Sequence, residues 1–167
     1  ILCNYILFIT NLAAKLQKNI DIFGIFVFFL YFCTLIHTFF SNMAIEIRQI
    51  TGKIDLLRFV KFGNEFYKDC ENFCPALILD ELNTFNPQKN PAFDVCEHVL
   101  YMAYKDGKAV GRIAGIINHQ ANAKWGVKHV RFGWMDFIDD LEVSRALLDA
   151  VAAWGKEKGM DAINGPV

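Results

Sequence analysis

A carboxylate stands inside an apolar run of this chain, and it is the side chain best placed to do chemistry. Asp136 lies within residues 132–138, which have the composition of a buried strand. Strict alternation places Asp136 on the same strand face as Phe132, Trp134 and Ile138. A carboxylate on such a face is costly unless it is paired or functional, so Asp136 is a candidate for either role.

Directly after this strand comes the predicted N-terminus of an amphipathic helix. Such a junction is where α/β proteins commonly hold a phosphate-bearing cofactor, because helix N–H groups and the helix dipole favour an anion. Here the junction carries no glycine and three acids, Asp139, Asp140 and Glu142. Their charge opposes a phosphate, although Asp139 and Glu142 also have the spacing of a capping box that stabilises a helix by itself.

Composition indicates one domain with a sizeable core and no general nucleic-acid surface. The chain has 167 residues, 54% of them hydrophobic, and a formal net charge of -1, whereas a nucleic-acid surface needs an excess of Lys and Arg. The five Cys include no Cys-x-x-Cys pair, and no His or Cys cluster completes a metal tetrahedron. We therefore predict no metal, a reducing intracellular setting, and ordinary buried thiols at positions that include Cys70 and Cys74.

An uncharged apolar run, residues 22–40, precedes the rest of the chain. As a helix it would cover roughly 28 Å, about the hydrocarbon thickness of a bilayer, so a membrane anchor is one interpretation. A second is that residues 1–42 are translated upstream DNA and that the native start is Met43, because position 1 is not Met and Phe, Ile, Leu, Asn and Lys dominate the segment. A third is a buried or signal-like helix.

From Met43 onward, hydrophobic periodicity predicts strands interleaved with helices. The turn Asp106-Gly107 favours a hairpin, because its positive φ angles match the twist of paired strands. The last helix should bury a stripe of Val143, Leu147, Val151 and Trp154. The expected elements are a strand at 44–50, helices at 53–70 and 75–82, hairpin strands at 99–105 and 109–118, a polar loop at 119–128, a strand at 130–138, a helix at 141–158 and a strand at 161–167.

This order resembles the GCN5-related N-acetyltransferase (GNAT) superfamily over about residues 44–167. The hairpin Tyr104-Lys105-Asp106-Gly107-Lys108-Ala109-Val110-Gly111-Arg112 is typical of its second and third strands. More narrowly, a divergent bacterial branch with ceramide-synthase-like N-acyltransferases is similar at Phe132-Gly133-Trp134, Asp139-Asp140-Leu141-Glu142-Val143, Ala146-Leu147-Leu148-Asp149-Ala150, and Gly159-Met160 through Gly165-Pro166. The resemblance implies an α/β (α+β) fold, a mixed central sheet with helices on both faces, truncated after the fifth strand.

The resemblance also implies a reaction, in which a neutral amine attacks an acyl thioester. The co-substrate would be acetyl-CoA or a long-chain acyl-CoA, and the acceptor a primary amine such as a lipid (sphingoid) amine. Such a site needs a donor for the developing oxyanion and a route for the amine proton. The implied catalytic candidates are Asp136, Asn118 and His119. The implied cofactor-binding residues are Trp134, Phe137, Ile138, Val143, Ser144 and Arg145, with backbone N–H groups near Phe137 and Ile138 polarising the carbonyl.

Structural roles stay open beside these functional ones. Asp136 can be a satisfied structural carboxylate, whereas a catalytic Asp136 predicts lost turnover with intact stability. Arg112 and Arg145 are the cations best placed for phosphates.

Because acids replace the family's basic residue and glycines at 139–144, either the acyl donor is bound elsewhere or the domain is a non-catalytic binding module that has lost CoA. A small membrane-anchored interaction protein is a third hypothesis. We expect a cytoplasmic protein, free or membrane-associated, with no nucleic-acid partner and no particular oligomeric state.

Overall fold

The computed structural model describes residues 27, 29–33 and 44–166, and the chain divides into two units, Ile1–Met43 and Ala44–Val167. In the first unit the described residues 27 and 29–33 are helical. Most of the apolar run at 22–40, with its alternative interpretations, lies outside the described residues. Within the part of the chain that is described, no helix is long and apolar enough to cross a membrane.

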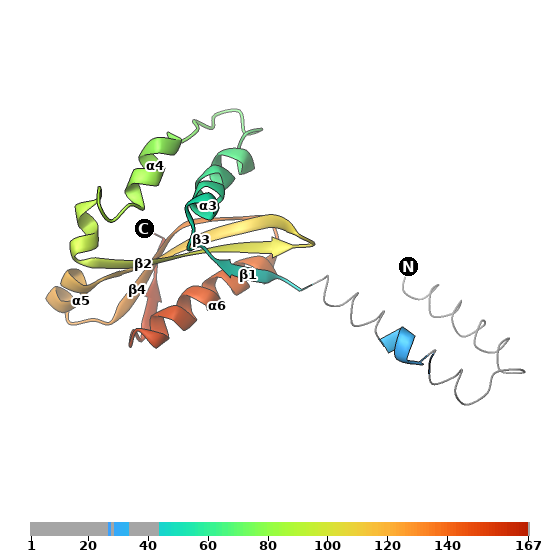
Figure 1. Cartoon of the computed structure of the whole chain (residues 1–167). Coiled ribbons are helices and arrows are strands. Elements are labelled where there is room, and N and C mark those ends of the chain that lie inside the picture. Colours follow the sequence, from blue (N-terminus) through green and yellow to red (C-terminus); the bar gives the residue numbers. More distant parts are fainter. Residues whose placement is uncertain (1–26, 28, 34–43, 167) are drawn as a thin grey trace, which may run out of the picture. The chain divides into compact units, whose positions relative to one another are not determined.

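The second unit is built on a five-stranded sheet in the order β1-β2-β3-β4-β5 (Figure 1). Its strands are β1 (Glu46–Gln49), β2 (Cys96–Lys105), β3 (Lys108–Asn118), β4 (His129–Phe137) and β5 (Ala162–Asn164). The first four pair antiparallel, and β5 pairs with β4 in parallel, so the predicted mixed sheet is confirmed. The hairpin prediction is also confirmed, with φ of 53° at Asp106 and 74° at Gly107 in the turn.

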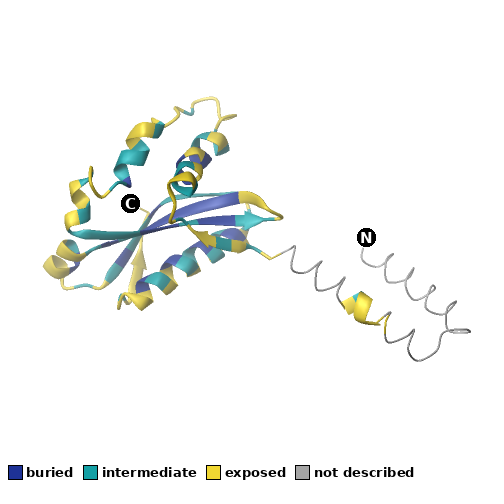
Figure 2. Cartoon of the chain, in the orientation of Figure 1, coloured by how far each residue is buried: buried dark blue, intermediate teal, exposed yellow. Residues whose placement is uncertain are grey.

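Helices cover both faces of the sheet, and the sheet separates the hydrophobic core into two clusters. The helices are α3 (Lys53–Phe66), α4 (Ile78–Thr84), α5 (His119–Trp125) and α6 (Leu141–Glu157), with a 3-10 turn, η1 (Pro91–Asp94). On one face α6 buries Val143, Leu147 and Val151, as predicted, against β2, β3 and β4. On the other face α3 buries Phe59 and Val60. Figure 2 shows the buried band running through the sheet between these layers.

Three local predictions differ from the structure, each through backbone hydrogen bonding. The segment 119–128 was expected as a polar loop, but it contains α5, because the Asn118 side chain accepts from the Ala121 N–H and Gly126 ends the helix at φ 64°. The second helix begins at Ile78, not near residue 75, because its first backbone hydrogen bonds run from the Asp80 and Glu81 N–H groups to the Leu77 carbonyl. The cap of α6 is Asp140, whose side chain accepts from the Glu142 N–H, and not Asp139.

The prediction of buried thiols is wrong for Cys70 and Cys74, which are exposed. Helix α3 ends at Phe66, so neither cysteine lies on its packed face. Cys96 is partly buried, and burial raises the pKa of its thiol. Among the described residues, no group of His, Cys, Asp and Glu side chains is arranged to hold a metal ion.

Candidate functional site

The strand β4 contains a bulge next to the candidate carboxylate. Arg112 of β3 pairs with Asp136, but Ala114 pairs with Gly133, so a single β3 residue faces Trp134 and Met135. Trp134 has φ 46°, a left-handed conformation that a bulky residue rarely adopts and that typically costs about 1–3 kcal/mol. Such strain persists only where the surrounding contacts hold it in place.

The bulge changes which side chains share a face of the sheet. Trp134 packs in the core beneath α3 and α4, and Asp136 accepts a hydrogen bond from Tyr67, which directly follows α3. Phe132 and Ile138 instead pack in the core beneath α6. The expectation that all four share one face is therefore wrong: the extra residue at the bulge interrupts the period of two between Phe132 and Trp134, and Ile138 lies beyond the end of β4 at Phe137.

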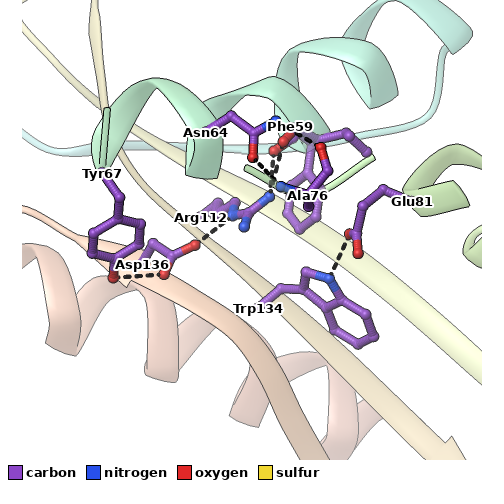
Figure 3. Close-up of polar contacts among 9 residues, drawn as sticks. Phe59, Asn64, Tyr67, Ala76, Glu81, Arg112, Trp134 and Asp136 are labelled. Atoms are coloured by element: carbon purple, nitrogen blue, oxygen red, sulfur yellow. Dashed lines mark hydrogen bonds and ion pairs between the residues drawn. The ribbon is translucent and has the colours of Figure 1, made fainter. Parts of the chain in front are cut away.

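Asp136 lies in a polar network that links α3, β3 and β4 (Figure 3). Its Oδ2 accepts from Arg112 Nε at 2.7 Å, and its Oδ1 accepts from the Tyr67 hydroxyl at 2.9 Å. The Arg112 Nη1 also donates to the Phe59 carbonyl at 2.8 Å, inside α3. The two charged side chains are only 10% and 14% exposed, so this is a buried ion pair. Burial, followed by the hydrogen bond to Asp136, raises the pKa of Tyr67.

A glycine in α3 leaves the space through which Arg112 reaches the helix. A Cβ at Gly63 would lie 2.2 Å from Arg112 Nη2 and 2.9 Å from its Cζ. Any larger residue would displace the guanidinium from the Phe59 carbonyl and from Asp136. Arg112 is thus occupied inside the protein, and it is not one of the cations available to a phosphate.

Trp134 joins the bulge to α4. Its indole Nε1 donates to Glu81 Oε2 at 2.9 Å, and its ring lies 4.9 Å from that of Phe85 in an edge-to-face arrangement. The segment before α4 is fixed to α3, since the Asn64 side chain both donates to the Ala76 carbonyl and accepts from the Ala76 N–H, each at 2.9 Å. Figure 3 shows the Trp134–Glu81 and Asn64–Ala76 hydrogen bonds beside the Arg112 network.

Beyond the bulge, one edge of β4 has no described partner. The strand β5 pairs with β4 only from His129 to Arg131. The Ile138 N–H donates to the Val110 carbonyl at 3.0 Å, so one of the two predicted carbonyl-polarising donors is already used. Neighbouring residues of an antiparallel strand direct their N–H groups to opposite sides, so the Phe137 N–H points away from β3, toward that edge.

The Asp140 side chain caps the N-terminus of α6. The Asp140 carboxylate accepts from the Glu142 N–H at 2.9 Å and from Lys105 Nζ at 2.7 Å. The hydrogen bond from Lys105 is the main cause that lowers the pKa of Asp140. Of the predicted cofactor-binding residues here, Val143 is fully buried, Ser144 Oγ donates to the Leu141 carbonyl at 3.0 Å, and Arg145 is exposed.

The other two catalytic candidates lie elsewhere. Asn118 ends β3 roughly 20 Å along the strand from Arg112 and caps α5. His119 Nε2 lies 2.8 Å from Glu97 Oε1 and is half exposed. The structure thus brings Asp136 and Trp134 together but does not bring Asn118 or His119 to them.

Sequence reasoning missed Tyr67 and Glu81 as residues of the site and misassigned Arg112. The signal that singled out Asp136, a charge inside an apolar strand, was equally present at Arg112. A cavity of about 460 Å³ between α6 and β5, lined in part by Val130, Met160 and Ile163, lies on the other face of the sheet and does not reach these residues.

No family model matches the chain. It is 36% identical over 123 residues to Protein YghO of Escherichia coli (strain K12), a match that covers 72% of this chain and 30% of that protein. It is 25% identical over 127 residues to bacterial ceramide synthase of Caulobacter vibrioides, covering 75% of this chain and 33% of that protein. The chain therefore spans about a third of the length of these relatives.

Solved structures share the fold at low sequence identity. An aminoglycoside acetyltransferase, meta-AAC0020, from an uncultured soil metagenomic sample aligns with a TM-score of 0.55 and 14% identity, over 76% of this chain and 79% of that one. An acetyltransferase of the GNAT family from Staphylococcus aureus Mu50 gives 0.51 and 17%, over 72% and 71%. Aminoglycoside N-acetyltransferase AAC(6')-Iy in complex with CoA gives 0.50 and 16%, over 74% and 77%.

The five-stranded mixed sheet with its helices matches the fold of these acetyltransferases, and the sequence similarity to bacterial ceramide synthase agrees with the motifs. This chain has the GNAT acetyltransferase fold as far as its fifth strand.

Proposed function

We propose that this chain forms part of an acyl-CoA-dependent N-acyltransferase that acts on a primary amine. The observation that carries the proposal is the bulge of β4 beside an edge that no described strand covers beyond Arg131. At that edge the Phe137 N–H is directed away from β3 and is suited to polarise a carbonyl. The similarity to acetyltransferase structures supports the same reaction class.

In the proposed reaction the amine nitrogen attacks the thioester carbonyl carbon. A carbon–nitrogen bond forms, the carbon–sulfur bond breaks, the amine loses a proton and the departing thiolate gains one. A backbone N–H aimed at the carbonyl oxygen stabilises the negative charge that develops there, without requiring a particular side chain. Asp136 holds the bulge in this scheme, because both of its oxygens already accept hydrogen bonds and Arg112 balances its charge.

In this proposal the acyl donor is an acyl-CoA, and its pyrophosphate needs binding groups in addition to the start of α6. The Asp140 carboxylate already occupies the Glu142 N–H, and it brings negative charge to the helix end. Lys105 offsets part of that charge through its ion pair with Asp140. Support for CoA itself comes from the CoA complex of a protein with the same fold. A long acyl chain would add apolar contacts to the binding energy.

For the acceptor we propose an amine that carries an apolar chain, such as a sphingoid amine. The similarity to bacterial ceramide synthase supports this choice. The described surface adds a second support, since Leu77 and Leu79 at the start of α4 are 71% and 75% exposed. The bonds from Asn64 to Ala76 hold this apolar segment in place. A lipid amine would reach the protein from a membrane surface, so membrane association belongs to the proposal.

Calorimetric titration with acetyl-CoA, palmitoyl-CoA and free CoA tests the donor. Tighter binding of palmitoyl-CoA than of the other two supports lipid N-acylation, and mass spectrometry should then detect the amide formed with a sphingoid amine. If acetyl-CoA binds more tightly and amide forms on short amines only, the N-acyltransferase proposal stands and the proposal of a lipid acceptor is rejected. Binding of none of the three would leave the fold without this chemistry.

A further inference from the structure

Glu81 is a carboxylate that lies beside the bulge and is oriented through only one of its two oxygens. Its Oε2 accepts from Trp134 Nε1, and in the described part of the chain no hydrogen bond or ion pair reaches its other oxygen. Both residues are partly buried, so the carboxylate is oriented and still accessible. Asp136 differs, because both of its oxygens are bonded and its charge is balanced by Arg112.

The surroundings of Glu81 have the chemistry that recognises an ammonium group. A carboxylate attracts the charge and accepts an N–H hydrogen bond. The Trp134 indole meets Glu81 at its Nε1 edge, which orients the carboxylate, and is itself packed against Phe85, whose ring centroid lies 4.9 Å away. The left-handed backbone at Trp134, φ 46°, places this indole under α4.

We propose that Glu81 binds the protonated amine of the acceptor, which releases that proton to solvent before the neutral amine attacks, and that Trp134 is the positioning residue of Glu81. The assignment rests on the proposed N-acyltransferase function and names the side chain that brings the amine to the bulge. Leu77 lies one turn before Glu81 and is 71% exposed, so an apolar chain attached to the amine would have an apolar side chain to contact. Glu81, and not Asp136, is then the acidic residue that contacts the acceptor.

The test uses octylamine, which is protonated at pH 7, and 1-octanol as a neutral probe of the same length, titrated into the full chain by calorimetry. The Glu81→Gln variant keeps an acceptor for the Trp134 N–H and loses the charge. We expect it to bind octylamine at least about tenfold more weakly while 1-octanol binding is unchanged. The matched control is Asp80→Asn, which removes the neighbouring, exposed charge of α4 and should change octylamine affinity less than about twofold.

Trp134→Phe keeps an aromatic ring but removes the donor that orients Glu81, so it should weaken octylamine binding less than Glu81→Gln does. Equal octylamine affinity in Glu81→Gln and the wild type would overturn the proposal. An equal loss in Asp80→Asn would do the same, since it would mean that any negative charge on α4 suffices. Absence of a preference for octylamine over 1-octanol in the wild type would also overturn it.

Palmitoyl-CoA titrations of the same samples separate this proposal from the proposed function. We expect Glu81→Gln to bind palmitoyl-CoA as the wild type does and, in a transfer assay, to raise KM for octylamine without raising KM for palmitoyl-CoA. If the chain binds no acyl-CoA but Glu81→Gln still loses octylamine binding, the N-acyltransferase proposal is rejected and the assignment of Glu81 as the amine-binding residue stands. Unchanged KM for octylamine in an active chain would reject the amine site alone.

Discussion

Removing the charge of Asp136 should destabilise the domain strongly, because Asp136 is the counter-ion of a buried guanidinium. The Asp136→Asn change keeps the shape of the side chain and leaves Arg112, whose side chain is 10% exposed, without its carboxylate. Breaking one half of a buried ion pair typically costs about 3–5 kcal/mol. We expect about 3 kcal/mol, since asparagine can still accept one hydrogen bond. That is a large share of the roughly 5–15 kcal/mol that stabilises an ordinary domain.

Urea unfolding at pH 7, followed by far-UV circular dichroism, measures this loss as a shift of the midpoint at constant slope. The matched control is Asp55→Asn, which breaks an ion pair with Arg58 on α3 whose side chains are 65% and 45% exposed. Exposed pairs contribute at most about 1 kcal/mol, so this change should be small. Replacing both partners, Arg112→Met with Asp136→Leu, should cost less than Asp136→Asn alone, because no buried charge remains unpaired.

Asp136 is not the counter-ion of a buried charge if Asp136→Asn loses no more stability than Asp55→Asn, or if the double variant is less stable than the single one. The same measurement decides an earlier expectation from the sequence. A purely catalytic Asp136 would lose turnover with intact stability, whereas the buried pair with Arg112 predicts that stability falls.

Three further outcomes follow from particular contacts. In urea unfolding, Gly63→Ala should destabilise the wild type by about 2 kcal/mol or more, because the new Cβ would displace Arg112. In the Arg112→Met/Asp136→Leu background the same change should instead stabilise the domain by up to about 1 kcal/mol, because alanine has the higher helix propensity. Asp140→Ser keeps the cap of α6 but removes its charge, so calorimetry should find CoA bound about two- to fivefold more tightly. Burial lowers the pKa of His98, so as pH falls the imidazole takes up a proton in the unfolded chain before it does so in the folded one. The free energy of unfolding should therefore fall as pH drops below about 6.5, and it should fall less in His98→Leu.

Each of these outcomes has a contrary result. An equal cost of Gly63→Ala in both backgrounds would mean that Arg112 is not what its Cβ meets. Unchanged CoA affinity in Asp140→Ser would place the pyrophosphate away from the start of α6. If the free energy of unfolding depends on pH identically in His98→Leu and the wild type, protonation of the partly buried His98 imidazole is not the cause of the loss of stability.

Much of the fold follows from local patterns in the sequence. The hairpin turn needs only Asp106 and Gly107, and the buried stripe of α6 needs only the spacing of Val143, Leu147 and Val151. These features depend on neighbours a few residues apart, so a single sequence is enough to predict them. The helix α5 was missed although its stop, Gly126, was visible, because a seven-residue polar segment has no apolar period to signal a helix.

The site could not be predicted in the same way, because it is made by register between distant segments. The bulge at Trp134 exists only relative to β3, where Ile113 faces two residues of β4. Asp136 was recognised as a residue that needs a partner, but neither Arg112 nor Tyr67 could be assigned to it without the pairing of the strands and the place where α3 ends. Glu81 lies in a short helix that carries no buried residue and so gives no pattern to read.

The two helices on this face of the sheet should differ in how readily they move. Helix α3 buries Phe59 and is tied to β4 through Arg112, so its opening requires a buried ion pair to separate. Helix α4 has no buried residue, and a single indole hydrogen bond joins Glu81 to the sheet. Local opening is easiest where few buried contacts must break, so α4 should exchange its amide hydrogens long before α3 does. Under the proposed function we expect an acceptor to enter from the side of α4, while α3 and the bulged strand stay together.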